Sequence, residues 1–261
     1  LIANRPSRKK ALSNGKYVFQ PAWYNVIFDT LTDLIYFGIG AVAASLICNY
    51  QPDMLIALVG LIVIVAYPAY YWYTTKMLLQ NAEYPFQLRL SQWNNAIKDA
   101  NVTYLLEFLK QKQKGKHLLI FGSQGTGKTT LAVALATEAS IKSSCCSYVT
   151  AVKLLCMFYN PLDMIYERSL WNWRKCDLLV IDDINPGLPV ESDIISADLF
   201  YNTLNNLQNG SHNIQHIRDK NIIWVMGSDD PTNKLEEKWV SLLHQLKVDP
   251  SNIKVIDLEE V

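Results

Sequence analysis

The chain has 261 residues, of which 50% are hydrophobic, and its 24 lysines and arginines balance 24 aspartates and glutamates. This composition excludes an intrinsically disordered chain and a polycation that coats nucleic acid. The balance hides an uneven distribution, because residues 1–116 carry 12 basic and 6 acidic side chains, whereas residues 117–261 carry 12 and 18. We therefore expect two parts with different roles.

Two long uncharged segments lie in the basic first part. Residues 34–48 and 54–73 contain no charged side chain, and about 20 apolar residues are enough for a helix to cross the bilayer core. A short link with a proline separates them, so the two helices should be antiparallel neighbours. The sequence predicts a transmembrane helical hairpin over residues 23–73, with Asp29 and Asp33 near a headgroup boundary.

The basic residues around this hairpin predict its orientation. The link contains no lysine or arginine, so the positive-inside rule places it outside the cell and both chain termini in the cytoplasm, with the spans in the inner membrane. A buried helix pair in a soluble protein is the alternative, and a cleaved signal peptide is disfavoured because a second span follows. The flanking basic residues are Arg5, Arg8, Lys9, Lys10 and Lys16 before the first span and Lys76 after the second.

A connector of mixed polarity follows the hairpin. Pro85 interrupts any single helix there, and apolar residues spaced at i, i+3, i+4 and i+7 predict an amphipathic helix over residues 102–112. Lysines then alternate up to Lys116, and we favour a solvated helix end over a strip that contacts phosphate or lipid. The predicted parts are a basic cytoplasmic N-terminus (1–22), the hairpin (23–73), the connector (74–101) and an ATPase core (102–261).

A complete phosphate-binding pattern opens the core. The apolar segment 116–122 (KHLLIFG) predicts a buried strand, and residues 130–136 predict the helix that such a loop requires. Glycines let the main-chain amides face an anion, and the helix N-terminus adds partial positive charge. We expect ATP here, with Lys128 on its β- and γ-phosphates and the Thr129 hydroxyl on Mg²⁺. The predicted nucleotide-binding residues are Gly122, Ser123, Gln124, Gly125, Thr126, Gly127, Lys128, Thr129 and Thr130.

A pair of carboxylates ends the next strongly apolar strand, which we place within residues 177–184 (DLLVIDDI). Asp182 is predicted to hold Mg²⁺ through water or through Thr129. Asp183 is predicted to orient and polarise the attacking water. The alternative gives both roles to Asp182 and makes Asp183 structural. Both acids are therefore candidate catalytic residues beside Lys128.

A third strand, residues 221–227 (NIIWVMG), precedes further polar side chains. Asp229 is a candidate for sensing the γ-phosphate and its water, with Ser228 as the second candidate. The alternative is a turn that Asp-Pro initiates, and we leave both open. No cysteine pair or histidine spacing indicates zinc, and the polar segment 211–220, which contains His212 and His216, is expected to be a loop.

Two more strands, over residues 147–150 and 252–258, complete a sheet. They alternate with predicted helices, and strand–helix alternation of this kind gives a parallel three-layer α/β fold. Ligands bind such sheets at the carboxyl ends of the strands, where all three motifs fall. The predicted helices cover residues 129–141, 151–158, 192–209 and 232–247.

Residues 105–261 resemble the nucleotide-binding core of AAA+ ATPases, within them the replication initiators, helicase loaders and transposon helper ATPases. The resemblance rests on the loop at 121–129 (FGSQGTGKT), the segment YVTA at 148–151 and the IDDI of residues 181–184. It implies ATP and Mg²⁺ as cofactors and oligomers formed through the cores. Such rings usually take an arginine from a neighbouring subunit, and no arginine follows Arg218 here. The alternatives are an arginine from a partner subunit, a substitute in Lys238 or Lys247, or a chain longer than these 261 residues.

The sequence thus predicts an ATP-hydrolysing motor or switch, anchored in the inner membrane, that remodels, assembles or moves a macromolecule. The acidic core favours a protein client over DNA, which usually binds basic surfaces, without excluding DNA. One alternative is a structural ATP-binding component of a membrane complex with little turnover. Another is a conjugation or secretion coupling ATPase, since these also place two spans before a P-loop core.

Overall fold

Five parallel strands form the centre of the core, in the order β5-β6-β7-β4-β8. The computed structural model describes residues 8–11, 16–20, 23–93, 95, 97–110, 114–159, 173–185, 195–227 and 234–258. The first strand of the core therefore lies inside the sheet, between the fourth and fifth strands along the chain. The strands are β4 (His117–Phe121), β5 (Cys146–Thr150), β6 (Leu178–Asp182), β7 (Asn221–Val225) and β8 (Ile253–Asp257).

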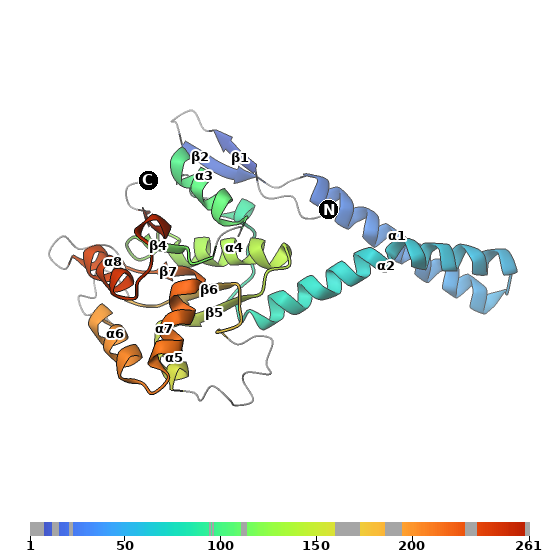
Figure 1. Ribbon diagram of the computed structural model, residues 1–261. Coiled ribbons are helices and arrows are strands. Elements are labelled where there is room, and N and C mark those ends of the chain that lie inside the picture. The colour runs from blue at the N-terminus through green and yellow to red at the C-terminus, as the bar shows by residue number, and fades with distance from the viewer. Residues whose placement is uncertain are drawn as a thin grey trace.

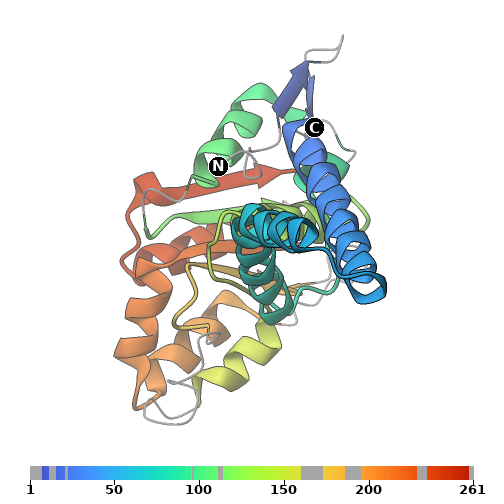
Figure 2. The same ribbon diagram turned by 90° about the vertical axis from the view of Figure 1, so that its right-hand side faces the viewer.

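Helices cover both faces of this sheet, as Figures 1 and 2 show. Along β4, Leu118 and Ile120 pack into one apolar cluster with α3 and α4, and Leu119 and Phe121 pack into another with helices α5 to α8. Strands buried on both faces are apolar at every position, because successive side chains alternate between the faces. The helices are α3 (Asp99–Phe108), α4 (Lys128–Ile141), α5 (Ala151–Phe158), α6 (Ala197–Asn206), α7 (Gly210–Asp219) and α8 (Leu235–Gln245).

The predicted parallel three-layer α/β fold is confirmed, and so is the alternation of its five strands with helices, to which the structure adds α7 between α6 and β7. Side-chain caps fix two of the helix starts. Thr150 Oγ1 accepts from Lys153 N at the start of α5, and Ser196 Oγ accepts from Leu199 N at the start of α6. Such caps satisfy main-chain N–H groups that have no partner within the helix. The amphipathic helix expected at 102–112 is α3, which begins and ends earlier.

The expectation of a loop at residues 211–220 is wrong, because nearly all of it is helix α7. The helix buries Gly210, Asn213 and Ile217, and two of these are not apolar, which hides the helical period in the sequence. Asn213 is buried because its amide has partners: Nδ2 donates to Phe158 O at 3.3 Å, and Oδ1 accepts from Arg174 Nε at 3.1 Å.

A small antiparallel sheet lies beside α3 and comes largely from the N-terminal segment expected only as a basic flank. Its strands are β1 (Arg8–Ala11), β2 (Lys16–Gln20) and β3 (Ile97–Lys98). Phe19 is buried at 6.3 Å from the ring of Trp93, next to the short helix η1 (Leu90–Gln92). The N-terminal segment and the connector therefore pack together on the core.

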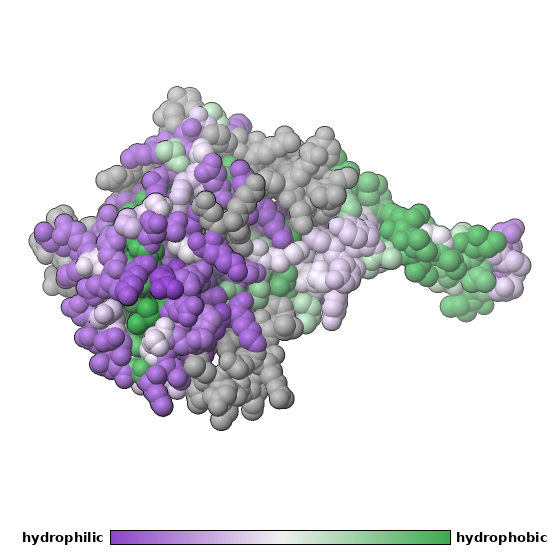
Figure 3. Space-filling model, in the orientation of Figure 1, coloured by the Kyte–Doolittle hydropathy of each residue, from purple (hydrophilic) through white to green (hydrophobic). Residues whose placement is uncertain are grey.

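Two long apolar helices extend away from the core as a hairpin (Figure 1). They are α1 (Trp23–Cys48) and α2 (Pro52–Asn81), which lie side by side. Both are long and apolar enough to cross a membrane, and 0% and 6% of their most apolar windows are buried. Their exposed side chains form the green surface of Figure 3, and the tip of the hairpin is hydrophilic.

Helix α2 passes Pro68 without a break and ends against the core. Tyr71 Oη donates to Ile141 O at the end of α4, at 3.0 Å, and Tyr84, just past α2, hydrogen-bonds Ser140 Oγ at 2.9 Å. The connector then continues along α4, where Arg89 forms an ion pair with the buried Glu138 at 2.8 Å. The hairpin and the α/β core are thus joined by a packed helix.

Candidate nucleotide site

The loop between β4 and α4 has the backbone that a phosphate site needs. Gly127 has φ +85° and ends the loop at the start of α4. A side chain there would be strained, and its Cβ would lie 3.1 Å from both Asn95 Nδ2 and Trp93 Nε1. A Cβ on Gly122 would lie 2.6 Å from Thr126 Oγ1. The loop therefore requires glycine at both positions.

The charged end of Lys128 lies over this loop. Its Nζ donates to Ser123 O at 2.7 Å, and Thr126 Oγ1 donates to the same carbonyl at 2.9 Å. Lys128 also begins α4, so its ammonium and the helix N-terminus lie at one place and attract an anion together. Thr129 and Thr130 follow in the first turn of α4, which is the position that the sequence predicted for them.

The connector holds the loop from outside. Trp93 Nε1 donates to Gly127 O at 3.3 Å, and Asn95 Nδ2 donates to Thr126 O at 2.8 Å. Sequence reasoning missed both residues, because they lie more than 30 positions before the loop residues that they contact and belong to no local pattern. Both contacts engage main-chain carbonyls of the loop and so help to hold its backbone in place.

The predicted carboxylate pair lies at the carboxyl end of β6. Asp182 is buried, with Oδ2 accepting from Tyr148 Oη at 2.7 Å and Oδ1 accepting from Asp183 N at 2.8 Å. Asp183 has φ +54°, the left-handed conformation that aspartate and asparagine tolerate best. Partial desolvation, and then the charge of Asp182, raise the pKa of Asp183, which suits a group that accepts a proton.

Main-chain contacts join the carboxyl ends of three strands. Asn185 Oδ1, just after the acids, accepts from Gly227 N at 2.6 Å at the end of β7. Gly227 O in turn accepts from Gly122 N, the first residue of the phosphate loop. Asn185 was also missed by sequence reasoning, as was Tyr148 on the neighbouring strand β5. Ser228 and Asp229, the predicted sensors, lie outside the described residues.

The side chains at this edge fit a magnesium ion held together with a nucleotide. Mg²⁺ prefers oxygen ligands and usually takes one or two carboxylates, waters and substrate phosphates. The Thr129 hydroxyl and the Asp182 carboxylate offer that donor set. Among the described residues no group of three or more His, Cys, Asp or Glu side chains forms a cage for a metal by itself.

Arg218, the last arginine of the chain, lies at the other end of the sheet. It ends α7 just before the amino end of β7, and its guanidinium pairs with Asp219 at 2.7 Å. The phosphate loop lies at the carboxyl ends of the strands. Arg218 therefore does not reach a nucleotide bound in its own subunit.

Comparison with known proteins gives one family match and several similar structures. The family described as IstB-like ATP binding protein matches residues 75–214, which is more than half of the chain. No curated protein matches it. The crystal structure of DnaI is 18% identical, with a TM-score of 0.40, and the match covers 70% of this chain and 90% of DnaI.

Two further structures are similar at the same level. The crystal structure of the DnaC helicase loader is 14% identical, with a TM-score of 0.41, over 72% of this chain and 97% of DnaC. AMPPCP-bound DnaA from Aquifex aeolicus is 18% identical, with a TM-score of 0.37, over 61% of this chain and 45% of DnaA. From the family match, the phosphate loop and the parallel sheet, the chain belongs to the IstB-like ATP-binding proteins and carries an AAA+ P-loop core.

Proposed function

We propose that the chain is a membrane-anchored ATPase that binds ATP with Mg²⁺ and hydrolyses it to remodel, assemble or move a macromolecular client at the inner membrane. The observation that carries this proposal is the meeting of two motifs at one edge of the sheet. Lys128 Nζ lies over the phosphate loop at 2.7 Å from Ser123 O, and the Asp182–Asp183 pair ends β6 at the same edge.

Each side chain has a separate task in this proposal. The amides of the loop and the Lys128 ammonium bind the β- and γ-phosphates, while Thr129 and Asp182 hold Mg²⁺. The ion neutralises charge that develops on the phosphates. Tyr148 keeps the Asp182 carboxylate in place through its 2.7 Å hydrogen bond, and Asp183 orients the attacking water and accepts its proton. Ser228 and Asp229 stay predicted sensors of the γ-phosphate.

The exposure of the hairpin supports the membrane anchor. Ile56 and Val63 of α2 and Phe37 of α1 are 72%, 68% and 77% exposed, whereas a helix in a soluble core buries such side chains. Residues 52–70, before α2 meets the core, rise about 28 Å, close to the thickness of the bilayer core. The basic flanks then keep both termini in the cytoplasm.

A neighbouring subunit is part of this proposal. Arg218 lies at the wrong edge of the sheet to contact a nucleotide in its own subunit, and we infer that an arginine from another chain, in a homo- or hetero-oligomer, completes the site. The same observation favours the second candidate, a structural ATP-binding component with little turnover. The acidic second half of the chain favours a protein client, and DNA stays possible through a local basic surface.

The test is steady-state ATP hydrolysis by the full chain in lipid nanodiscs. Wild type is expected to hydrolyse ATP, and Lys128→Ala and Asp183→Asn to lose that activity by about 100-fold or more, since each removes a group that acts on the transferred phosphoryl group or its water. Lys153→Ala, at an exposed lysine outside the site, is the matched control. Wild-type turnover equal to that of Lys128→Ala, with ATP still bound, would establish the structural candidate instead.

A further inference from the structure

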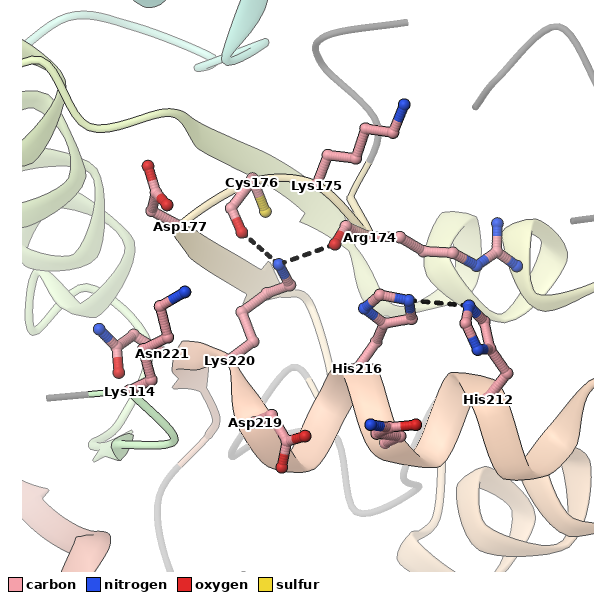
Figure 4. A pocket seen from close by; sticks show the side chains of 11 residues that line it. Lys114, Arg174, Lys175, Cys176, Asp177, His212, His216, Asp219, Lys220 and Asn221 are labelled. Atoms are coloured by element: carbon pink, nitrogen blue, oxygen red, sulfur yellow. Dashed lines mark hydrogen bonds between the residues drawn. The ribbon is translucent and has the colours of Figure 1, made fainter. Parts of the chain in front are cut away.

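A basic pocket of about 340 Å³ lies at the amino ends of β4, β6 and β7, opposite the nucleotide edge (Figure 4). Strands of five residues separate the two edges, which is about 16 Å of β-strand. The pocket is therefore a different place from the phosphate loop. Its charged and titratable lining consists of Lys114, Arg174, Lys175, Lys220, His212, His216, Cys176, Asp177 and Asp219.

Positive charge dominates this lining. Four of the side chains are lysine or arginine, against the two carboxylates Asp177 and Asp219. Both carboxylates are engaged elsewhere: Asp219 pairs with Arg218 at 2.7 Å, and Asp177 Oδ2 accepts from Cys145 N at 3.0 Å. The pocket therefore presents a net positive field to whatever enters it.

Lys220 is buried at the back of the pocket, with 9% of the residue exposed. Figure 4 shows its Nζ donating to two main-chain carbonyls, those of Arg174 and Cys176. Carbonyl dipoles carry no net charge to balance an ammonium, and an ammonium has three N–H donors. The residue can therefore donate to one more acceptor, and a negative one is favoured most.

Two histidines face each other beside this lysine. His212 and His216 lie one turn apart on α7, with their Nε2 atoms 2.9 Å apart, so the pair shares one N–H. Burial, followed by the neighbouring His212, Lys220 and Arg174, lowers the pKa of His216 to about 4, and Asp219 opposes this only weakly. Burial, together with the cations around it, therefore opposes a positive charge on the His216 ring.

These cations also decide between two kinds of ligand. A neutral pair of histidines at i and i+4 is a plausible half of a metal site. A divalent metal, however, would meet the same Lys220 and Arg174 charges that suppress protonation of His216. An anion reverses the sign of that interaction and is stabilised by both.

We propose that this basic pocket binds a tetrahedral oxyanion, a phosphate or sulfate group, and takes up a proton at the His212–His216 pair when it does so. The group belongs either to a free phosphorylated compound or to the backbone of a nucleic acid, which share this chemistry. Because the anion offsets the charges of Lys220 and Arg174, it raises the pKa of His216. Binding is therefore tighter at lower pH.

Sulfate is the probe, since its charge is constant between pH 5 and 8. Calorimetric titration of the full chain in nanodiscs, at low ionic strength and with saturating Mg·ADP in the nucleotide site, measures its affinity. We expect tighter binding and net proton uptake at pH 5.5 relative to pH 8. The double variant Lys114→Gln/Lys175→Gln, at two exposed positions, should bind at least about fivefold more weakly.

Three variants give the controls. Lys153→Gln, an exposed lysine outside the pocket, should bind like wild type. His216→Asn should keep measurable binding and lose its pH dependence. The proposal is overturned by absence of sulfate binding at pH 5.5, by equal affinity of the Lys114→Gln/Lys175→Gln variant, or by a tight Ni²⁺ site that excludes sulfate. If ADP fails to bind, the Lys114→Gln/Lys175→Gln variant still distinguishes sulfate bound in this pocket from sulfate bound at the phosphate loop, because only the former is weakened.

A short single-stranded oligonucleotide identifies the source of the oxyanion. If it displaces sulfate and loses the same factor of affinity in Lys114→Gln/Lys175→Gln, the pocket takes a backbone phosphate. If oligonucleotide leaves sulfate bound, the ligand is a free oxyanion or phosphorylated small molecule. Both results support an oxyanion site.

Discussion

Asp183 lowers the stability of the folded chain at the position where it is proposed to act on the attacking water. Its φ of +54° strains the backbone, and partial burial, followed by the charge of Asp182, disfavours the ionised side chain in the folded state. A carboxyl with a raised pKa destabilises the fold at pH values above that pKa, where the unfolded chain releases its proton more easily. The proposed role of Asp183 as a proton acceptor accounts for a residue at this position that costs stability.

Two substitutions separate these effects. Asp183→Asn and Asp183→Ala are both expected to abolish hydrolysis, but Asn tolerates the left-handed conformation, whereas Ala pays about 1 kcal/mol for it. Asp183→Asn should therefore unfold at a higher temperature than Asp183→Ala, and at pH 8 at least as high as wild type. Thermal melts followed by tryptophan fluorescence measure this. An Asp183→Ala protein as stable as Asp183→Asn would contradict it.

His117 makes stability depend on pH. It is fully buried on β4, where Nδ1 accepts from Trp224 Nε1 at 3.1 Å, and desolvation lowers its pKa to about 4. The unfolded chain, with the ordinary pKa of about 6.5, binds the proton first as the pH falls. The free energy of unfolding should thus drop by about 2 kcal/mol between pH 7.5 and 5.

His117→Gln isolates that contribution, because a glutamine oxygen can accept the Trp224 hydrogen bond but does not titrate. Urea titrations at several pH values are expected to show a smaller acid loss for the variant than for wild type. His216, whose pKa is also about 4, is unchanged in both proteins. Equal losses in the two would show that His117 does not titrate in this window.

Among single residues, the sequence predicts those that belong to a contiguous motif. The phosphate loop is one continuous run of residues, and so is the pair of acids at the end of β6. The geometry of each therefore follows from the strand that precedes it and, for the loop, from the helix that follows. Tyr148, Asn185 and Asn95 are not predictable in this way, because each acts through a hydrogen bond that sheet order or connector packing brings about. The assigned roles of the site residues stay predictions until the variants are measured.

Among the elements, the connector and α4 depend on one buried ion pair. Glu138 is 1% exposed, and its carboxylate accepts from Arg89 Nε and Nη2 at 2.8 and 3.3 Å. Removing Arg89 takes away the arginine that pairs with this buried carboxylate, which is costly even if the intact pair contributes little. This pair fixes the connector that carries Trp93 and Asn95 to the phosphate loop.

Arg89→Leu should lower the free energy of unfolding by about 2 kcal/mol, at the low end for a buried pair because a third of the arginine side chain is exposed. The matched variant is Lys153→Met, which removes the exposed pair with Glu83 and should cost less than about 0.5 kcal/mol. Urea denaturation measures both. Similar costs for the two variants would show that burial of Glu138 is unimportant.

Elements with an apolar period were predictable, and those without one were not. The strands of the parallel sheet and helix α5 have continuous or periodic apolar residues. Helix α7 places Asn213 at a core position, and β2 lies in a segment whose lysines indicated a solvated flank. Asn213 is compensated by tertiary hydrogen bonds and Phe19 of β2 by its neighbour Trp93, and no local pattern records these contacts.

For the whole molecule, the decisive question is whether the hairpin lies in lipid. Val59 on α2 is 54% exposed, and Val152 on α5 of the core is 49% exposed. An arginine near the middle of a transmembrane helix costs about 2.5–3.5 kcal/mol, and on an aqueous surface it costs little. Substituting arginine at each of these two positions therefore tests whether the position is surrounded by lipid or by water.

Val59→Arg should markedly reduce the carbonate-resistant membrane fraction, and Val152→Arg should leave it unchanged. Fractionation of expressing cells, with immunoblotting of pellet and supernatant, is the measurement. If both variants and wild type were found in the supernatant, the hairpin would instead pack against a protein partner.

The contact between α2 and α4 has a mechanical consequence. Helix α4 begins at Lys128, at the phosphate loop, and ends at Ile141, whose carbonyl receives the Tyr71 hydroxyl of α2. A helix of 14 residues spans about 21 Å, and α-helices transmit axial displacement with little compression. Any movement of α4 along its axis during the proposed nucleotide cycle would therefore displace the end of α2. The phosphate loop and the orientation of the hairpin would then be mechanically coupled.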